Sequence, residues 1–284
     1  MATAVGATEC RLGERCPYHY LFETPPPAGS QILNKVPTAP RPFVLEPPIN
    51  GKRLYSPGEP LAFGLILIGR ALDYLPYFVY VFDELGHRGI GQGKGCFRLA
   101  EVSTLDAAGV ARPIYQGASR RLSDRSHVVT GEDLAAARPT PNGTITLTFL
   151  TPTRLVYDGH TTGPAEFHIL FRNLLRRVSF LNYFHCGGEL LDDPKSLIEA
   201  ARAITTVEAR LRSHTWERYS ARQGQRVPMG GFTGQVTYRG DLTPFWPWLA
   251  LGECVHVGKG ATFGLGQYRI KTVTTTTETA VEEE

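Results

Sequence analysis

The sequence of 284 residues contains no apolar run that reaches the ~18 residues of a membrane span. Its longest candidate, residues 61–82, is interrupted by Arg70, Asp73 and Pro76. The first residues also lack the basic segment followed by an apolar segment that is typical of a secretion signal. We therefore expect a soluble, cytoplasmic protein with no membrane partner.

The sequence also has few cysteines and a low net charge. Five cysteines, an odd number, in a chain without a secretion signal are typical of reduced thiols. Cys10, Cys16 and His19 have a poor spacing for zinc, because a structural zinc site needs four ligands and no close fourth is evident. There is no carboxylate cluster spaced for two metal ions, so we expect neither a metal nor another cofactor. The formal net charge is only +3.

Turn-forming residues, by contrast, are abundant. The 30 glycines and 21 prolines exceed the usual combined share of about 12%. They are spread through the chain, which favours many short strands and loops and argues against a helical bundle. A hydrophobic fraction of 42% is typical of a folded protein, and the length allows one large domain or two of ordinary size.

The first half predicts a strand, a helix, a glycine-rich loop and a second strand, after a proline-rich start. Residues 61–68 are a compact apolar run typical of a buried strand. Apolar residues then recur at helical spacing over residues 72–85, and Gly86 can end the helix. The loop at 87–95 leads into residues 96–103, which predict a strand.

The second half predicts a similar order of elements. Ile145, Leu147 and Phe149 alternate with threonines, which indicates a strand. Asp193 and Pro194 are typical of the start of a helix. The expected elements are a strand at 145–149, helices at 165–184 and 193–213, a strand at 231–239, a short helix at 243–252, strand-like residues 253–257, a loop at 258–266, a strand at 267–273 and a solvated tail at 274–284.

The two halves end alike, because Leu85-Gly86 precedes one glycine-rich loop and Leu251-Gly252 precedes the other. Repetition at this separation predicts two copies of one α+β unit rather than a short-period solenoid. Tandem ferredoxin-like units, each an antiparallel sheet with helices on one face, fit this order. We place the domains at residues 1–140 and 141–273, followed by the tail at 274–284.

Neither glycine-rich loop fits a nucleotide-binding fingerprint. The dinucleotide pattern G-x-G-x-x-G requires a helix next, whereas a strand is predicted after each loop. The phosphate-loop pattern also fails, since position 88 is Arg and neither Ser nor Thr follows Lys94. Nucleotide hydrolysis is therefore not expected.

Glycine at alternate positions leaves backbone N–H groups that a polyanion can approach, and a lysine in each loop adds charge. The alternative is a tight connection that merely needs positive φ angles. Under the first interpretation, the contacting residues are Lys94 in the first loop and Gly258, Lys259, Gly260, Gly264 and Gly266 in the second.

Clustered arginines favour nucleic acid as that polyanion. Arginine contacts phosphates through a planar fork and also stacks on bases, and aromatic rings give bases a platform. The alternative is that these basic residues form ordinary solvated faces. The clusters are Arg172, Arg176 and Arg177 on the predicted helix at 165–184, and Arg218 and Arg222 among the aromatic residues of segment 216–223.

Two C-terminal segments are distinctive, Met229-Gly-Gly-Phe-Thr-Gly-Gln-Val-Thr-Tyr-Arg-Gly240 and His256-Val-Gly-Lys-Gly-Ala-Thr-Phe-Gly-Leu-Gly266. They resemble the closing segment of the CRISPR-associated pre-crRNA-processing endoribonucleases of the RAMP superfamily. Residues 16–24, 89–102 and 183–186 also resemble that family. The final glycine-rich segment is the most specific part of the resemblance.

The resemblance implies two ferredoxin-like, RNA-recognition-like domains that bind CRISPR repeat RNA and cleave the transcript into guide RNAs without a metal. In that chemistry the 2′-hydroxyl attacks the phosphorus, giving a 2′,3′-cyclic phosphate or 3′-phosphate and a 5′-hydroxyl. Histidine suits such proton transfer near neutral pH. His185 and His256 lie in family-like segments and are the candidate catalytic residues, with His256 expected on a strand that enters the loop at 258–266. Either histidine can instead be a hydrogen-bonded support for the structure around it.

In this family an opening strand and helix usually precede the cysteine-containing stretch, and that helix often carries the catalytic histidine. Here Met1 lies only fifteen residues before Cys16, and no histidine occurs between His19 and His87. We therefore expect a first domain without its opening elements. An alternative function is a non-catalytic RNA-binding subunit that holds guide RNA together with other CRISPR effector subunits. Another is a scaffold that contacts mainly protein partners.

Overall fold

The structure is a computed structural model that describes residues 16–26, 30, 32, 38–91, 93–123, 127–162, 166–215, 217–220 and 224–272. Among these residues no helix is long and apolar enough to cross a membrane. The chain forms two compact units, each built from three segments. Unit 1 is Met1–Val44, Leu65–Ala137 and Ser179–Leu190, and unit 2 is Leu45–Gly64, Arg138–Val178 and Leu191–Glu284.

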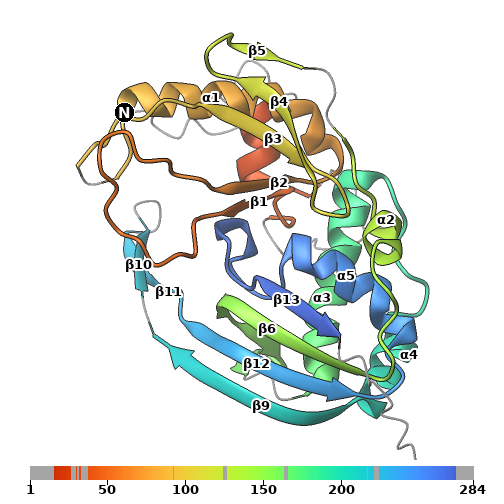
Figure 1. Cartoon of the computed structure of the whole chain (residues 1–284). Coiled ribbons are helices and arrows are strands. Elements are labelled where there is room, and N and C mark those ends of the chain that lie inside the picture. Colours follow the sequence, from red (N-terminus) through yellow and green to blue (C-terminus); the bar gives the residue numbers. More distant parts are fainter. Residues whose placement is uncertain are drawn as a thin grey trace, which may run out of the picture. The chain divides into compact units, whose positions relative to one another are not determined.

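Unit 2 contains a four-stranded antiparallel sheet (Figure 1). Its strands lie in the order β13-β6-β12-β9, so the first strand of the sequence is central and the last is at an edge. This βαββαβ order is ferredoxin-like, and the predicted α+β fold class is confirmed. The elements are β6 (Thr144–Thr153), α3 (Phe167–Leu181), β9 (Thr205–His214), β12 (Gly231–Arg239), α5 (Trp246–Val255) and β13 (Tyr268–Thr272).

Both long helices of unit 2 cover the same face of this sheet. On β6, buried Ile145, Leu147 and Phe149 alternate with half-buried residues, as expected for a strand with one covered face. Phe167 of α3 packs edge-to-face against Tyr238 of β12. The Tyr268 hydroxyl of β13 donates to the Leu249 carbonyl of α5 over 2.8 Å. The opposite face of the sheet is therefore the open one.

The predicted helix at 193–213 is wrong beyond its first two turns. Asp193 caps α4 (Pro194–Ala200) by accepting a hydrogen bond from the Ser196 amide, as its position predicts. A single 3-10 turn follows, and Thr205 then begins β9. The β-branched residues at 205–207 and the pairing of β9 with β12 favour an extended chain there.

The remaining elements of unit 2 are short. The predicted strand-like residues 253–257 are also wrong, because α5 continues through Val255. The additional strands are β7 (Leu155–Tyr157), β8 (His160–Thr162), β10 (Glu217–Ser220) and β11 (Gln225–Pro228), and 3-10 turns lie at Ala201–Ala203, Thr243–Phe245 and Ala261–Phe263.

Unit 1 is built from short strands around one long helix, which agrees with the predicted strand-helix-loop-strand order. The predicted strand at 61–68 is observed as β2, the predicted helix continues to Arg88, and the predicted strand at 96–103 begins later, at Glu101. Strands β1 and β2 form one two-stranded sheet, of which residues 43–44 and 65–67 belong to unit 1 and residues 45–46 and 64 to unit 2, and β3, β4 and β5 form another sheet. The elements are β1 (Phe43–Glu46), β2 (Gly64–Leu67), α1 (Leu75–Arg88), β3 (Glu101–Leu105), β4 (Ala111–Gln116), β5 (Arg121–Leu122) and α2 (Gly131–Ala136).

The core of unit 1 is a small cluster of Leu21, Phe43, Ala71 and Phe78. The expectation of a first domain without its opening elements falls on residues 1–15, which lie outside the described residues, as does the whole predicted tail at 274–284. The domain limits at 140 and 273 stay a prediction.

Candidate functional site

His256 is completely buried at the end of α5, not on a strand as predicted. It is the C-cap of α5, with φ of 61°, and its side chain is 0% exposed. Its Nδ1 lies 3.1 Å from the Leu265 carbonyl, and its Nε2 lies 2.8 Å from Oε1 of Glu46. Gln267 donates a further hydrogen bond to the same Glu46 oxygen.

Both ring nitrogens of His256 therefore face acceptors. Two N–H donors are needed, so the pair is an imidazolium with the Glu46 carboxylate, or a neutral ring with a proton on Glu46. Either form ties the end of β1 to the loop after α5. The ring of His256 has no exposed surface, and both of its nitrogens are in contact with protein acceptors.

In the glycine-rich loop at 258–266, the expectation of open amides is wrong for Gly264 and Gly266, because both amides are hydrogen-bonded within the protein. The amide of Gly264 donates to the Ala261 carbonyl, and that of Gly266 donates to the Pro152 carbonyl. Both glycines are buried, and Gly258 and Gly260 are half-buried at positive φ. The side chain of Lys259 is exposed. Lys259 therefore remains a candidate contact for a polyanion in this loop.

The first glycine-rich loop is exposed, in contrast to the second. A bridge between Ile90 and Gly95 closes it, and Gly91 and Gly93 have open space where a Cβ atom would stand. Lys94 ends the turn that begins at Gly91, with φ of 47° and an exposed side chain. Lys94 therefore remains a candidate phosphate contact in unit 1.

The arginines of α3 do not form one surface. Arg172 lies over the Tyr157 ring, 5.3 Å from its centroid, and near Asp158, while Arg176 is exposed. Arg177 points into the protein, where its Nε donates to the Val255 carbonyl at the end of α5 over 2.7 Å. Burial lowers the pKa of Arg177 to about 10. Its role is to neutralise the carboxyl end of a helix.

Strands β10 and β11 extend the β9–β12 hairpin beyond the sheet (Figure 1). His214 pairs with Gly231 at the end of the sheet, and Glu217 pairs with Pro228 in the extension, so the register continues without a shift. Arg218 is in β10, opposite Val227. Its side chain lies outside the described structure, as does all of Arg222.

Sequence reasoning missed a cationic face on β9 that leads into this extension. Arg210, Arg212 and His214 lie at alternate positions, so they share one face of the strand, and all three are exposed. Arg210 pairs with exposed Gln235, whereas the next residue pair of the hairpin includes fully buried Val236. The face therefore lies on the open side of the sheet. The pattern R-x-R-x-H is visible in the sequence at 210–214, but the predicted helix at 193–213 includes both of its arginines.

A hollow lies on the sheet beside this face. Its polar lining includes Arg210, Arg212, Thr233 and Gln235. Arg210 is paired with Glu208 over 2.6 Å, but such exposed ion pairs contribute little and exchange readily for another anion. His214 accepts or donates a hydrogen bond with Thr233 over 2.7 Å. The arrangement offers cations and hydroxyl groups side by side.

His185, the other predicted catalytic residue, is only 2% exposed. Its Nε2 lies 2.7 Å from the Pro40 carbonyl, and its Nδ1 lies 3.1 Å from the hydroxyl of Tyr20. Tyr20 is half-buried, and the Arg70 guanidinium lies 4.9 Å from the centroid of its ring. All four residues belong to unit 1. His185 is thus held between the Tyr20 hydroxyl and the Pro40 carbonyl.

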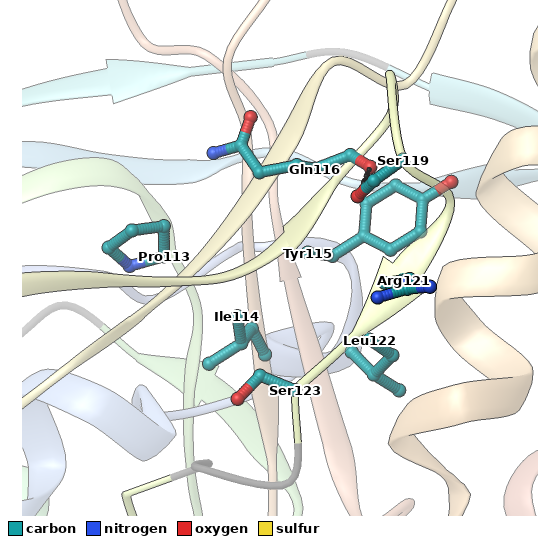
Figure 2. Close-up of a pocket in the computed structure, with 8 residues that line it drawn as sticks. All are labelled: Pro113, Ile114, Tyr115, Gln116, Ser119, Arg121, Leu122 and Ser123. Carbon is teal, nitrogen blue, oxygen red and sulfur yellow. Dashed lines mark hydrogen bonds between the residues drawn. The ribbon is translucent and has the colours of Figure 1, made fainter.

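Another hollow lies in unit 1, along β4 and β5 (Figure 2). Figure 2 shows the Tyr115 ring beside Arg121. Among the described residues of its lining, Arg121 is the only charged one, and none of the predicted site residues is there. Among the described residues there is also no group of three His, Cys, Asp or Glu side chains that could hold a metal ion.

Comparisons with known proteins give two matches to family models. Residues 147–268 match the model described as CRISPR-associated endoribonuclease Cas6. Residues 1–127 match the model AF_1859_N, described as an N-terminal domain. An uncharacterized protein from Archaeoglobus fulgidus is 26% identical over 271 residues, which cover 92% of this chain and 82% of that protein.

Solved structures resemble the chain at low identity. A Thermus thermophilus Cas6 product complex is 20% identical, with a TM-score of 0.53 over 81% of this chain and 82% of that one. A Cas6-RT-Cas1--Cas2 complex is 15% identical, with a TM-score of 0.51 over 82% of this chain and 24% of that one. These likenesses show the fold and agree with the predicted tandem ferredoxin-like class.

Proposed function

We propose that this chain, which contains a domain of the CRISPR-associated endoribonuclease Cas6 family at residues 147–268, binds CRISPR repeat RNA and takes part in its processing. The observation that carries the binding proposal is the cationic face of β9. We define this face as Arg210, Arg212 and His214. It continues in the same register toward Arg218 on the projecting β10–β11 hairpin.

The spacing of this face suits a sugar-phosphate backbone. Alternate residues of a strand are about 6.6–6.8 Å apart, so successive cations can follow successive phosphates along one RNA strand. The neighbouring side chains are polar, such as Thr233 and Gln235 opposite the two arginines. Hydroxyl, amide and guanidinium groups contact phosphate and 2′-hydroxyl oxygens, so this face binds the backbone of the RNA.

The cleavage half of the proposal is metal-independent transesterification of the repeat transcript. In it, the ribose 2′-hydroxyl attacks the adjacent phosphorus and leaves a 2′,3′-cyclic phosphate and a 5′-hydroxyl. The protein has to position the attack in line, move the proton and stabilise charge on the phosphorane. Exposed Lys94 and Lys259 are further candidate contacts to the RNA backbone, alongside Arg172 and Arg176.

A second candidate function is a non-catalytic subunit that holds guide RNA with other CRISPR effector subunits. One observation favours it: the ring nitrogens of His185 and His256 are all engaged by protein atoms, and both side chains are buried. Neither histidine can touch RNA directly in this arrangement. If the chain cleaves RNA, another side chain makes the contact.

Incubation of the full chain with labelled repeat RNA in excess EDTA separates the two functions. We expect a retarded complex and products that end in a cyclic phosphate, which acid or phosphatase treatment identifies. A shuffled RNA of the same length is the control for recognition of the repeat. Tight binding without cutting supports the holding subunit, and no binding to either RNA rejects both functions.

A further inference from the structure

Two π-helical turns meet in unit 1. They are His19–Glu23, near the start of the described chain, and Asn182–Cys186, at the end of α3. π-Helical turns are rare in proteins, and they occur frequently at functional sites. Here the hydrogen bond between Tyr20 and His185 joins one turn to the other. This juxtaposition of two unusual turns through one pair of titratable side chains needs an explanation.

The hydrogen bonds fix which atoms donate. A carbonyl accepts only, so Nε2 of His185 carries a hydrogen and donates it to Pro40. In the neutral ring, Nδ1 is then the acceptor, and the Tyr20 hydroxyl donates to it. Burial raises the pKa of Tyr20 to about 12, against an opposing effect of Arg70, so the hydroxyl keeps its proton at neutral pH. Tyr20 is therefore the proton donor of the pair, and Nδ1 of His185 is the acceptor.

A cation is held against this pair. Gly69, at φ of 56°, packs directly on the carbonyl of His185, and a Cβ atom there would lie 2.1 Å from that oxygen. The next residue, Arg70, is exposed and extends over the ring of Tyr20. The close approach at Gly69 thus brings the backbone of Arg70 next to the turn that carries His185.

We propose that Tyr20 and Arg70 form the site at which the RNA strand is cleaved, with His185 as the residue that positions Tyr20 and receives its proton. This inference rests on the proposed function and names the residues that act on the scissile phosphate. It also accounts for the burial of His185, because the histidine acts through the tyrosine and does not contact the RNA.

The reaction balances with water as the only other participant. Tyr20 takes the proton of the ribose 2′-hydroxyl as its own proton passes to Nδ1 of His185, which becomes an imidazolium. The electron pair of the 2′-oxygen forms the bond to phosphorus, and the bond to the 5′-oxygen breaks with its electron pair on that oxygen. The 5′-oxygen takes a proton from water, and the resulting hydroxide takes the proton of the Tyr20 hydroxyl as the extra proton of His185 Nδ1 returns to Tyr20. Arg70 stabilises the negative charge of the phosphorane.

A purely structural role makes a different prediction. The Tyr20 ring packs against the core cluster of unit 1 and against Arg70, and a phenylalanine ring preserves both contacts. Only the hydroxyl serves the proposed chemistry. The neighbouring Tyr74, whose ring centroid is 5.7 Å from that of Tyr20, provides a matched control for loss of a hydroxyl.

The test compares Tyr20→Phe with Tyr74→Phe in single-turnover cleavage of repeat RNA in EDTA, with RNA affinity and melting temperature measured in parallel. We expect Tyr20→Phe to cleave about 10²–10⁴-fold more slowly, the usual contribution of a general acid or base, with RNA affinity unchanged. Tyr74→Phe should cleave at the wild-type rate. A substrate with a 2′-deoxy sugar at the scissile position should not be cut by either variant.

Arg70→Gln keeps the test decisive if Tyr20→Phe does not fold, because Arg70 is exposed. It should slow cleavage strongly, whereas Arg88→Gln, at another exposed arginine of unit 1, should not. Wild-type rates in both Tyr20→Phe and Arg70→Gln, or an equal loss in Tyr74→Phe, overturn this site while leaving the proposed function intact. If the wild-type chain binds repeat RNA but never cuts it, cleavage and this site fail together and RNA binding stands.

Discussion

At the residue scale, His256 lies in a motif that predicts a catalytic histidine, but its side chain is buried. The motif His256-Val-Gly-Lys-Gly placed a histidine next to a lysine, which is a reasonable pattern for phosphate chemistry. The fold buries the ring against Glu46, a residue 210 positions earlier in the chain. No local pattern in the sequence could have indicated that partner, because it comes from an element in the first half of the chain.

Removing this histidine should reduce stability, not RNA affinity. His256→Ala removes a fully buried ring and one of the two side chains that hydrogen-bond Glu46, and such a loss typically costs about 1–3 kcal/mol. His214→Ala, which removes an exposed histidine, should cost less than about 0.5 kcal/mol. Urea unfolding measures both free energies. A His256→Ala variant as stable as His214→Ala would contradict the supporting role.

Two glycines with positive φ allow the cost of a steric clash to be compared with the cost of left-handed backbone strain. Gly264 has φ of 81°, and a Cβ atom there would lie 2.7 Å from the Leu45 carbonyl and 2.6 Å from Pro47. Gly91 has φ of 74°, but a Cβ atom there would meet nothing within 4 Å. Gly91→Ala should therefore cost only the left-handed strain of about 1–2 kcal/mol.

Gly264→Ala should cost clearly more than that, because it adds a steric clash to the same strain. Thermal or urea unfolding of the two variants gives the difference directly. Equal losses would mean that the loop at 258–266 is not held against Leu45 and Pro47. RNA affinity should be unchanged in Gly264→Ala at temperatures where the variant is folded.

At the element scale, the sequence predicted the strands and helices whose pattern is local. The alternation in β6 and the capping residue of α4 were sufficient for those two elements. β9 was missed because its residues Val207, Glu208, Ala209 and Arg210 fit a helix as well as an exposed edge strand. Pairing with β12 decides between them, and pairing is a tertiary effect. The same error concealed the cationic face.

The β10–β11 hairpin should be separable from the sheet. Replacing residues 216–229 by a two-residue Asn-Gly turn joins Thr215 to Gly230, where the register is continuous. The removed segment includes buried Met229, so the melting temperature should fall somewhat, but the paired residues of the four-stranded sheet all remain. RNA affinity should fall, because Arg218, Arg222 and Arg226 are lost with the hairpin. A filter-binding titration checks this, and an unchanged affinity would limit the interface to the sheet itself.

At the scale of the whole molecule, the distribution of charge matters more than its total. The net charge of +3 gave little reason to expect a polyanion as partner. Cations on one strand create a local electrostatic field that the net charge of the chain does not reveal. Only the extended conformation of β9 brings Arg210, Arg212 and His214 to one face. The fold class was predictable from the order of elements, whereas this face required the pairing of β9 with β12.

The salt dependence of RNA binding tests the central claim most directly. Each phosphate neutralised by a cation adds about 0.7–0.9 to the slope of log K against log salt concentration. The Arg210→Gln/Arg212→Gln variant should therefore bind repeat RNA more weakly and with a slope smaller by about 1.5. The control Arg112→Gln/Arg202→Gln removes two exposed, ion-paired arginines elsewhere and should leave the slope unchanged. Identical slopes for the wild type and Arg210→Gln/Arg212→Gln would contradict the account.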